Sequence, residues 1–473
     1  MRWLFVIGLF AIPFDSVPGP GFLGELGNEA SFPFLAAAIA IAVGLSLGSG
    51  ESRLSSSLAL KVGAGIVAVI FISWAVNAFT IETALVRERS GYNKFLTSLL
   101  VILYGIALAW LAEQVDESDL RRWLVRPIVW SAVACSLYAL FELVGRSGPL
   151  EPLFRPIDNL IHARQTDVIN AWNGSINYKV LYGWDPRLRS VSFEPPAFGN
   201  FCGFAWPWVW FAAVTAPPER KLRTWGALLL FTTVTLVARS RTGKMMLAAE
   251  IGTLLLLSLL YLRPRTGSEA GAVLRAAVPL VGIIAAFALA AYGIHDYSLL
   301  VAGVVGGESV SDLSRLGFLV AALNIFATHP LFGVGLGQFG FHAAAYLPEW
   351  AYLSPEIPPM LYYPNGPWPV VYALYARIAA ELGILGLLGW IGLWCTLAVR
   401  LMGRARDRVA TGERWTMQHP MILTCVAVLI SGIASDTFRT PMIWIGLGLA
   451  CGALRRARPS RDGMALNPAS ARA

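Results

Sequence analysis

The stretch LKVGAGIVAVIFISWAVNAF, residues 60–79, decides the fold class, because it is almost entirely apolar and carries a single charged residue near its start. It lacks the alternation of apolar and polar residues that marks a membrane barrel strand. A helix needs roughly 20 apolar residues to cross a bilayer core, and this run has that length. Similar runs are TWGALLLFTTVTLVA (224–238) and AAVPLVGIIAAFALAAYG (276–293). The chain is therefore predicted to cross a membrane with α-helices.

The composition excludes a water-soluble globular protein. Of the 473 residues, 56% are hydrophobic and 14% are charged, whereas a soluble domain carries roughly 25% charged residues. The formal net charge is +8, and basic loops suit the anionic inner leaflet of a bacterial membrane. We therefore expect membrane lipids as neighbours and no nucleic acid as a partner.

The apolar segments predict an all-α, polytopic transmembrane bundle of about twelve spans. The predicted spans lie near residues 3–14, 31–48, 60–80, 95–113, 126–145, 195–215, 224–238, 244–262, 276–293, 370–398, 418–435 and 440–454. The first also resembles a signal peptide, but no small-residue cleavage site follows it, so we predict an uncleaved helix. Lysine and arginine in short loops mark the cytoplasmic side. The basic clusters at 404–414 and 455–461 therefore predict a bacterial inner-membrane protein with both termini in the cytoplasm.

Several arginines fall in loops that this topology places on the outer side, against the usual bias of positive charge. The main ones are Arg189, Arg239, Arg241 and Arg315. A guanidinium group donates two parallel hydrogen bonds to phosphate oxygens, so an outer arginine cluster suggests an anionic, lipid-linked substrate. The alternative is that single arginines pair with nearby acids such as Asp158 or with lipid headgroups.

Two long outer loops, near residues 146–194 and 294–369, interrupt the predicted spans. Long loops in compact proteins usually carry function. The second contains the amphipathic stretch SRLGFLVAALNIFATH (314–329) and a segment rich in proline, tyrosine and tryptophan (344–369). Such aromatic residues suit either the membrane boundary or stacking on sugar rings. We expect a large periplasmic, partly helical loop.

Four short motifs follow one another in a characteristic order: RSVSFEP (189–195), SRTG (240–243), HPLFGVGLG (329–337) and ELGI (381–384). Arg315 lies ahead of the third. This order, in a chain of many spans with one large late outer loop, resembles that of the O-antigen ligase and O-antigen polymerase superfamily. The resemblance covers roughly residues 185–400 by motif and the whole chain by predicted topology.

The resemblance implies a metal-independent, GT-C-like membrane glycosyltransferase without cofactors. Such enzymes move a glycan from an undecaprenyl-pyrophosphate carrier to an acceptor hydroxyl on the periplasmic side. The departing pyrophosphate needs fixed cations or a metal to stabilise its charge, and the outer loops offer arginines rather than acidic metal ligands. The resemblance therefore implies Arg241 and Arg315 as the pyrophosphate-binding pair, with Arg189 and Arg239 as further candidates.

An acceptor hydroxyl also needs a base within reach, or a precisely oriented glycan. In the ligase branch a histidine ahead of the Glu-Leu-Gly motif is expected, but residues 363–372 contain none. This departure favours the polymerase branch. Glu194 is the first candidate base, with capping of the next helix as its alternative role. His329 is the second candidate, with a structural His-Pro as its alternative, and His342 ranks below it.

The sequence thus predicts a polymerase of lipid-linked oligosaccharide repeat units for O-antigen or exopolysaccharide. Expected partners are undecaprenyl-pyrophosphate-linked glycans, a flippase and a chain-length regulator. We expect N-terminal helices with the first outer loop at 1–193, a ligase/polymerase-like core at 194–400 that includes loop 294–369, and C-terminal helices with a basic tail at 401–473. The nearest alternatives are a ligase that transfers the glycan to lipid A–core and a protein-glycosylating oligosaccharyltransferase. A transporter is a more distant one.

Overall fold

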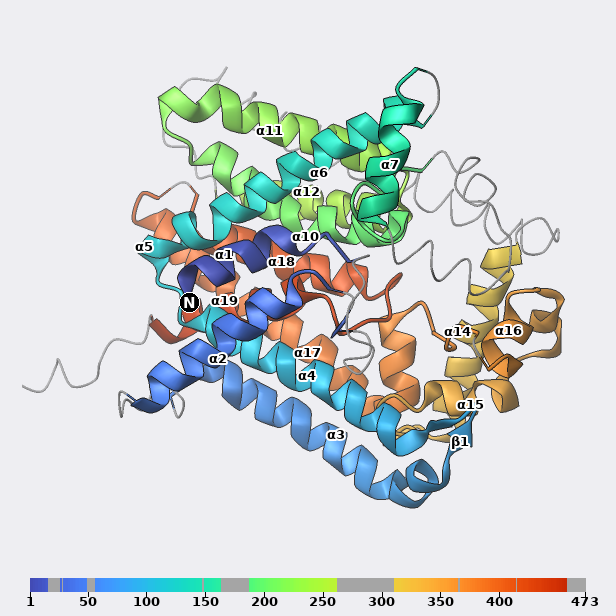
Figure 1. The fold of residues 1–473 in the computed structure, drawn as a ribbon. Coiled ribbons are helices and arrows are strands. Elements are labelled where there is room, and N and C mark those ends of the chain that lie inside the picture. Colours follow the sequence, from blue (N-terminus) through green and yellow to red (C-terminus); the bar gives the residue numbers. More distant parts are fainter. Residues whose placement is uncertain are drawn as a thin grey trace, which may run out of the picture.

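Long helices lying side by side make up most of the computed structural model (Figure 1). The structure describes residues 1–15, 26–27, 29–48, 56–146, 149–162, 187–261, 310–364, 366–413 and 415–456. Within these ranges the strands are limited to β1 (Leu85–Val86) and β2 (Arg89–Ser90), which pair antiparallel. The predicted helical fold class is therefore confirmed.

The helices follow the predicted spans closely. The first part of the chain contains α1 (Arg2–Ala11), α2 (Phe32–Gly48), α3 (Leu58–Thr83), α4 (Gly91–Glu113), α5 (Glu117–Leu120), the π-helix η2 (Arg121–Val125), α6 (Arg126–Gly145) and α7 (Glu151–Ile161). The rest contains α10 (Pro195–Val214), α11 (Pro218–Val237), α12 (Arg241–Tyr261), α14 (Val310–Thr328), α15 (Phe339–Tyr346), the 3₁₀-helix η3 (Glu349–Leu353), α16 (Ile357–Tyr362), α17 (Leu374–Ala410), α18 (Gln418–Ser431) and α19 (Pro441–Arg456). Each predicted span coincides with a helix except 276–293, which lies outside the described residues.

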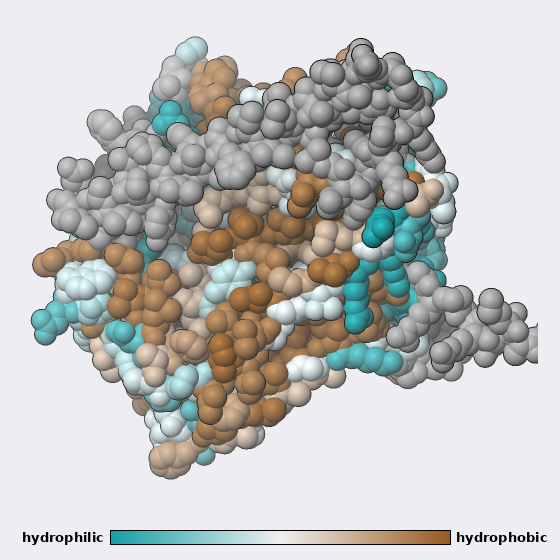
Figure 2. Space-filling view, turned by 180° about the vertical axis from the view of Figure 1, so that it is seen from behind, coloured by the Kyte–Doolittle hydropathy of each residue, from teal (hydrophilic) through white to brown (hydrophobic). Residues whose placement is uncertain are grey.

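Among the described residues, four helical stretches are long and apolar enough to cross a membrane. They are Leu58–Thr83, Gly91–Glu113, Glu117–Gly145 and Leu374–Ala410. In the first of them, only 22% of the most apolar window is buried inside the chain. Soluble proteins rarely expose such surfaces, and Figure 2 shows apolar side chains spread over the middle of one face with hydrophilic ones at its right-hand end. These features agree with a membrane protein.

Helix α10 lies at the centre of the bundle and contacts α6, α11, α12 and α18. It is buried along nearly its whole length, as expected for a helix that is apolar on all sides. In Figure 1, α3 and α4 form one side of the bundle, while α6, α11 and α12 form the opposite side. Helix α19 packs against α4, and α18 packs against α17.

The described part of the large late loop forms a small helical unit. Helices α14, α15 and α16 enclose a separate apolar cluster that includes Phe318, Ile325, Phe339 and Met360. This cluster also takes in the beginning of α17 through Ala380. The loop is therefore partly helical, as the sequence predicted, and it is anchored to the bundle at the start of α17.

Helix α17 differs from its predicted bounds of 370–398. Residues 370–373 are not helical, and the helix continues to Ala410, through the predicted regional boundary at 400. The extension is rich in arginine and alanine, which favour helix even where the sequence is no longer apolar. The main apolar core runs from Phe5 to Leu454, so all three predicted regions contribute to one packed core.

Candidate functional site

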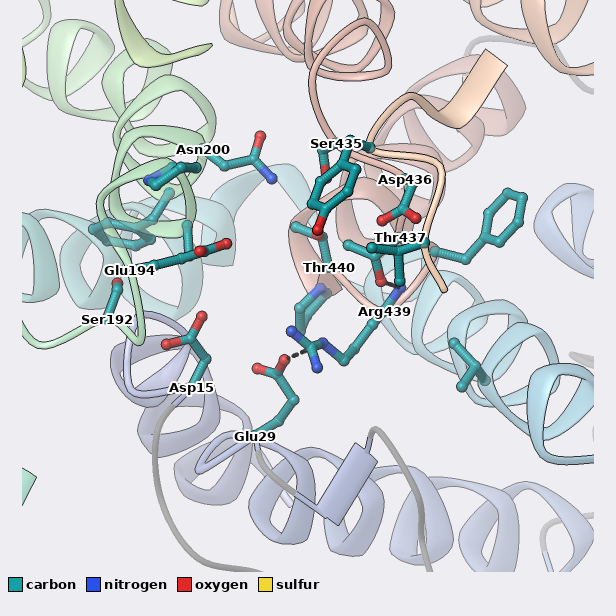
Figure 3. Close-up of a pocket in the computed structure, with 18 of the residues that line it drawn as sticks. Asp15, Glu29, Ser192, Glu194, Asn200, Ser435, Asp436, Thr437, Arg439 and Thr440 are labelled. Atoms are coloured by element: carbon teal, nitrogen blue, oxygen red, sulfur yellow. Dashed lines mark hydrogen bonds and ion pairs between the residues drawn. The ribbon is translucent and has the colours of Figure 1, made fainter. Parts of the chain in front are cut away.

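A cavity of about 660 Å³ lies at the end of the bundle where α10 and α19 begin. Its walls come from the segment after α1, the start of α4, the turn before α10, the segment leading into α17 and the loop between α18 and α19. The charged residues that line it are Asp15, Glu29, Arg89, Lys94, Glu194, Arg377, Asp436 and Arg439. The cavity therefore offers carboxylates and cations to one small volume. Figure 3 shows several of these side chains directed toward that volume.

Glu194 is the residue immediately before Pro195, the first residue of α10. It occupies the N-cap position, but its side chain makes no capping hydrogen bond. The carboxylate is exposed to the cavity instead. Because the cavity walls enclose it, burial raises the pKa of the Glu194 carboxyl above its ordinary value, and the charge of Arg315 is the main opposing influence. A carboxylate with a raised pKa is a stronger proton acceptor than an ordinary one.

Asp15 stands beside Glu194, in the turn that follows α1 (Figure 3). The backbone N–H of Phe193 donates to Asp15 Oδ1 at 2.6 Å. Burial raises the pKa of Asp15, while Arg439 and this hydrogen bond lower it. The bond also fixes the turn that carries Glu194. Asp15 thus positions the neighbouring carboxylate and adds its own negative charge, which further raises the pKa of Glu194.

Arg439 provides a cation on the opposite wall, just before α19. Its Nε lies 2.8 Å from Glu29 Oε1, the ion pair drawn in Figure 3. Arg377, in the first turn of α17, donates from Nη1 to the backbone carbonyl of Asp436 at 2.6 Å. Asp436 in turn accepts a hydrogen bond from the backbone N–H of Val371 at 3.0 Å. These contacts tie the loop before α19 to the segment leading into α17, with both guanidinium groups at the cavity.

The hairpin β1–β2 and the first turn of α4 bring two further cations, Arg89 and Lys94, to the cavity lining. Arg89 lies 5.1 Å from the centre of the Trp368 ring, and the Lys94 amine lies 5.9 Å from it, both within cation–π range. Arg87 in the turn donates to the carbonyls of Met360, Pro364, Gly366 and Pro367. Arg87 therefore holds the loop 360–367 in place, while Arg89 and Lys94 face the cavity.

Arg315 reaches the same region from α14. Its guanidinium carbon lies 5.3 Å from the centre of the Tyr372 ring, and Tyr372 lines the cavity. Tyr372 has φ of 62°, an uncommon backbone conformation for a bulky residue. Residues held in such conformations cluster at functional sites. The structure thus brings two predicted site residues, Glu194 and Arg315, to one place.

The HPLFGVGLG motif docks on a kink in α17. Gly383 has φ of 67° and interrupts the helix, which leaves preceding carbonyl groups without helical partners. The backbone N–H of Val334 donates to the carbonyl of Ala380 at 2.9 Å, and that of Gly335 donates to the carbonyl of Glu381 at 2.8 Å. Two motifs that are separate in the sequence therefore form one joint. It fixes α14, with Arg315, relative to the start of α17, with Arg377.

Steric crowding explains why position 333 of this joint is a glycine. A Cβ added at Gly333, where φ is 63°, would collide with the backbone of Ala380 and Glu381. From α3, Ser73 Oγ donates to the carbonyl of Phe332 at 2.6 Å, and the Asn77 amide donates to that of Gly333 at 3.0 Å. Close backbone packing therefore explains the glycine at this position.

The SRTG motif lies where α11 meets α12. Gly243 packs against α10, because a Cβ at this position would stand 3.0 Å from the Cα of Gly199. Thr242 lines the cavity, whereas Arg239 and Arg241, which both precede it, are exposed and are not among its described lining residues. Small residues at a helix crossing allow such close approach. The motif therefore places Thr242 in the cavity wall, with Arg241 as its immediate neighbour in the sequence.

Arg189 is buried, with an exposed fraction of 1%. Its Nη2 lies 2.5 Å from Asp158 Oδ2 on α7, and Asp158 also accepts a hydrogen bond from the Tyr138 hydroxyl at 3.0 Å. Burial alone would raise the pKa of Asp158, but its contacts with His162 and Arg189 lower it. Arg189 thus follows the alternative expected from the sequence, a pairing with Asp158, and does not line the cavity.

His329 lies at the end of α14, and its ring centre is 6.4 Å from that of His342. The Thr328 hydroxyl lies 2.9 Å from His329 Nδ1. Burial and the neighbouring His329 lower the pKa of His342. Neither histidine is among the described lining residues of the cavity. The two histidines form a separate polar cluster on the loop unit.

Sequence reasoning did not name Asp15, Glu29, Arg377, Asp436 or Arg439 as site residues. The available signal was that each lies at or near the end of an apolar segment predicted to face the outer side. The chain matches no protein-family model. A search of curated proteins also found no match.

Proposed function

We propose that this protein is a membrane glycosyltransferase that polymerises repeat units carried on undecaprenyl pyrophosphate, as in the O-antigen polymerase and ligase superfamily. The observation that supports it most is the cavity in which a carboxylate with a raised pKa, Glu194, faces the cations Arg377 and Arg439, with Arg315 behind Tyr372. A proton acceptor and anion-binding groups in one cavity are what transfer of a glycan from a pyrophosphate carrier requires.

In the proposed reaction, the acceptor sugar hydroxyl attacks the anomeric carbon of the donor glycan. Glu194 accepts the hydroxyl proton as the new glycosidic bond forms. The bond between the anomeric carbon and the pyrophosphate oxygen breaks, and undecaprenyl pyrophosphate leaves with the electron pair. Arg315, Arg377 and Arg439 stabilise the added negative charge, and Arg241 contributes from the edge of the cavity beside Thr242. Fixed cations stabilise such charge well because they need not reorganise during reaction.

The proposal includes a GT-C-like bundle of about twelve spans in the bacterial inner membrane, with both termini in the cytoplasm. The cavity then faces the periplasm, where lipid-linked repeat units are joined. The growing chain on its carrier is the donor, and the incoming repeat unit on a second carrier is the acceptor. Residues 363–372 contain no histidine, which supports polymerase over ligase.

The test is polymer formation in a strain that lacks its own copy of the gene. Wild type, Arg315→Ala, Arg241→Ala and a control, Arg155→Ala, are compared by separating the glycan as a length ladder on a gel. Arg155 is exposed on α7, where it pairs with Glu151. Membrane levels of every variant are measured by immunoblot.

A polymerase with arginine-bound pyrophosphate predicts that Arg315→Ala, and more weakly Arg241→Ala, reduces the ladder to single repeat units on lipid A–core. The control should give the wild-type ladder. Loss of all attachment, with polymer accumulating on the carrier lipid, would identify a ligase instead. An unchanged ladder from both site variants at normal protein level would refute the assignment of the arginines and favour a transporter.

A further inference from the structure

A second cavity, of about 360 Å³, lies at the opposite end of the bundle. Helix α17 runs from Arg377 at the first cavity to Arg404 and Arg408 at the second, and α19 runs from Met442 to Arg456 in the same direction. We call this second pocket the arginine pocket, defined by Arg404, Arg408 and Arg456. It is built independently of the candidate glycosyltransfer site.

The three arginines are held by the ends of neighbouring helices. Arg404 donates to the carbonyls of Ala453 and Leu454 at the end of α19, and Arg456 donates to the carbonyl of Val115 at 3.1 Å. A guanidinium group has five N–H donors, and these contacts use only some of them. Both cations are therefore positioned by backbone contacts and keep donors for a ligand.

Two carboxylates also line the pocket. Glu117 forms a two-point ion pair with Arg408, with the Arg408 Nη2 to Glu117 Oε2 distance at 2.9 Å, and Asp407 is exposed. The three arginines thus outnumber the carboxylates by one. Counted over its lining residues, the pocket therefore favours an anionic ligand.

Gln418, the first residue of α18, gives an independent indication of a ligand. Its exposed fraction is 5%, and its side chain lines the pocket. Among the described residues, Gln418 Oε1 has no hydrogen-bond partner. A buried acceptor oxygen without a donor is costly, and a ligand that offers a hydroxyl or an N–H group there removes this cost. The N-terminus of a helix also favours a negative group nearby. The first turn of α18 faces this pocket, since both Gln418 and Met421 line it.

The other wall of the pocket is apolar. Leu120, Met417, Met421 and Ala453 contribute to it. A free phosphate ion would gain nothing from such a wall, whereas a lipid places glycerol and the start of an acyl chain beside its phosphate. The polar and apolar sides together therefore favour a lipid over a soluble ion.

We propose that the arginine pocket binds the phosphodiester headgroup of an anionic membrane phospholipid. Arg404 and Arg456 donate hydrogen bonds to the phosphate oxygens, and Gln418 Oε1 accepts one from a headgroup hydroxyl. The acyl chain follows the wall formed by Met417 and Met421. Basic pockets between transmembrane helices bind anionic headgroups in this way. The bound lipid would join α5, α17, α18 and α19 at this end of the bundle.

The test uses the full-length protein purified in neutral detergent. Its melting temperature is measured with added phosphatidylglycerol, with phosphatidylcholine and with inorganic phosphate, and retained lipid is counted by native mass spectrometry. The variants are Gln418→Leu, Arg456→Gln and the control Arg400→Gln. Arg400 is exposed on α17, is not among the described lining residues, and carries the same charge at the same end.

Phosphatidylglycerol should raise the melting temperature of wild type and of Arg400→Gln, with one lipid retained. Arg456→Gln should weaken its binding by about tenfold or more, since it removes a charge-assisted hydrogen bond to the phosphate. Gln418→Leu should weaken it by about three- to tenfold, since it removes a neutral hydrogen bond from a headgroup hydroxyl. If Arg456→Gln fails to fold, Gln418→Leu alone decides. Equal stabilisation by phosphatidylcholine or by inorganic phosphate would overturn the lipid assignment, and equal binding by both pocket variants and wild type would overturn the site. Neither result depends on glycosyltransfer activity.

Discussion

Replacing Glu194 with glutamine separates its proposed chemical role from a structural one. The change keeps the size and polarity of the side chain but removes its ability to accept a proton. Glu194 makes no capping hydrogen bond to α10, so the amide should not disturb the start of this helix. Loss of a general base typically lowers a rate by roughly 10²–10⁴-fold, which corresponds to about 3–5.5 kcal/mol of activation free energy.

Glu194→Gln should lower the rate, but it should not lower the stability of the folded protein. Burial is the main reason that the pKa of the Glu194 carboxyl in the folded state lies above its ordinary value of 4.5. Its ionised form therefore costs folding free energy at neutral pH, and this cost disappears as the pH falls through the folded-state pKa. A neutral glutamine should leave the melting temperature at neutral pH unchanged or higher. Wild-type activity should decline on the acidic side at a pH above 4.5, as the base becomes protonated.

The assay is single-turnover joining of lipid-linked repeat units in proteoliposomes, measured across a pH series. The matched control is Glu349→Gln, because Glu349 is an exposed glutamate on η3, away from the described cavity lining. We expect Glu349→Gln to match wild type. A Glu194→Gln protein that retains activity within about threefold of wild type would refute the role of Glu194 as the base. A large drop in melting temperature would instead indicate a structural role.

Three further predictions concern packing and charge. Gly199→Ala should lower the free energy of unfolding by about 1–3 kcal/mol, and the melting temperature with it, because the added methyl collides with the Ser240 side chain. Gly226→Ala should leave the melting temperature unchanged, because the space around Gly226 is open. Gly383→Ala should reduce the yield of folded protein in detergent, since the added methyl meets the backbone of Leu331 at a position with φ of 67°; a normal yield would contradict the joint described above. Arg439→Gln should lower the joining rate by roughly 10²–10³-fold at normal membrane level, and a wild-type rate would exclude it from the anion site.

The helices were predictable because long apolar segments leave little choice of structure. The runs around 60–79 and 224–238 both became helices, since a bilayer core satisfies backbone groups only within helices or closed barrels. The continuation of α17 to Ala410 was not predicted, because apolar length marks the membrane-crossing part of a helix and not its polar extension.

The site was only partly predictable. Glu194 and Arg315 stood out because each lies in a motif or an outer loop, and the structure brings them together. The proximity of Asp15 to Glu194, across almost 180 positions of sequence, depends on how α1 packs on α6. Arg189 has the same residue type as Arg315, yet Asp158 binds it in the interior. Residue type and loop position do not contain that information, whereas tertiary packing does.

The most direct test of the proposed glycosyltransfer is a count of products. Purified protein in proteoliposomes is supplied with a radiolabelled, undecaprenyl-pyrophosphate-linked repeat unit, and both the glycan length and the released carrier are measured. We predict one undecaprenyl pyrophosphate released for each new glycosidic linkage, with both products lost together in Glu194→Gln. Movement of the intact lipid-linked substrate across the membrane without any released carrier would contradict the proposed function.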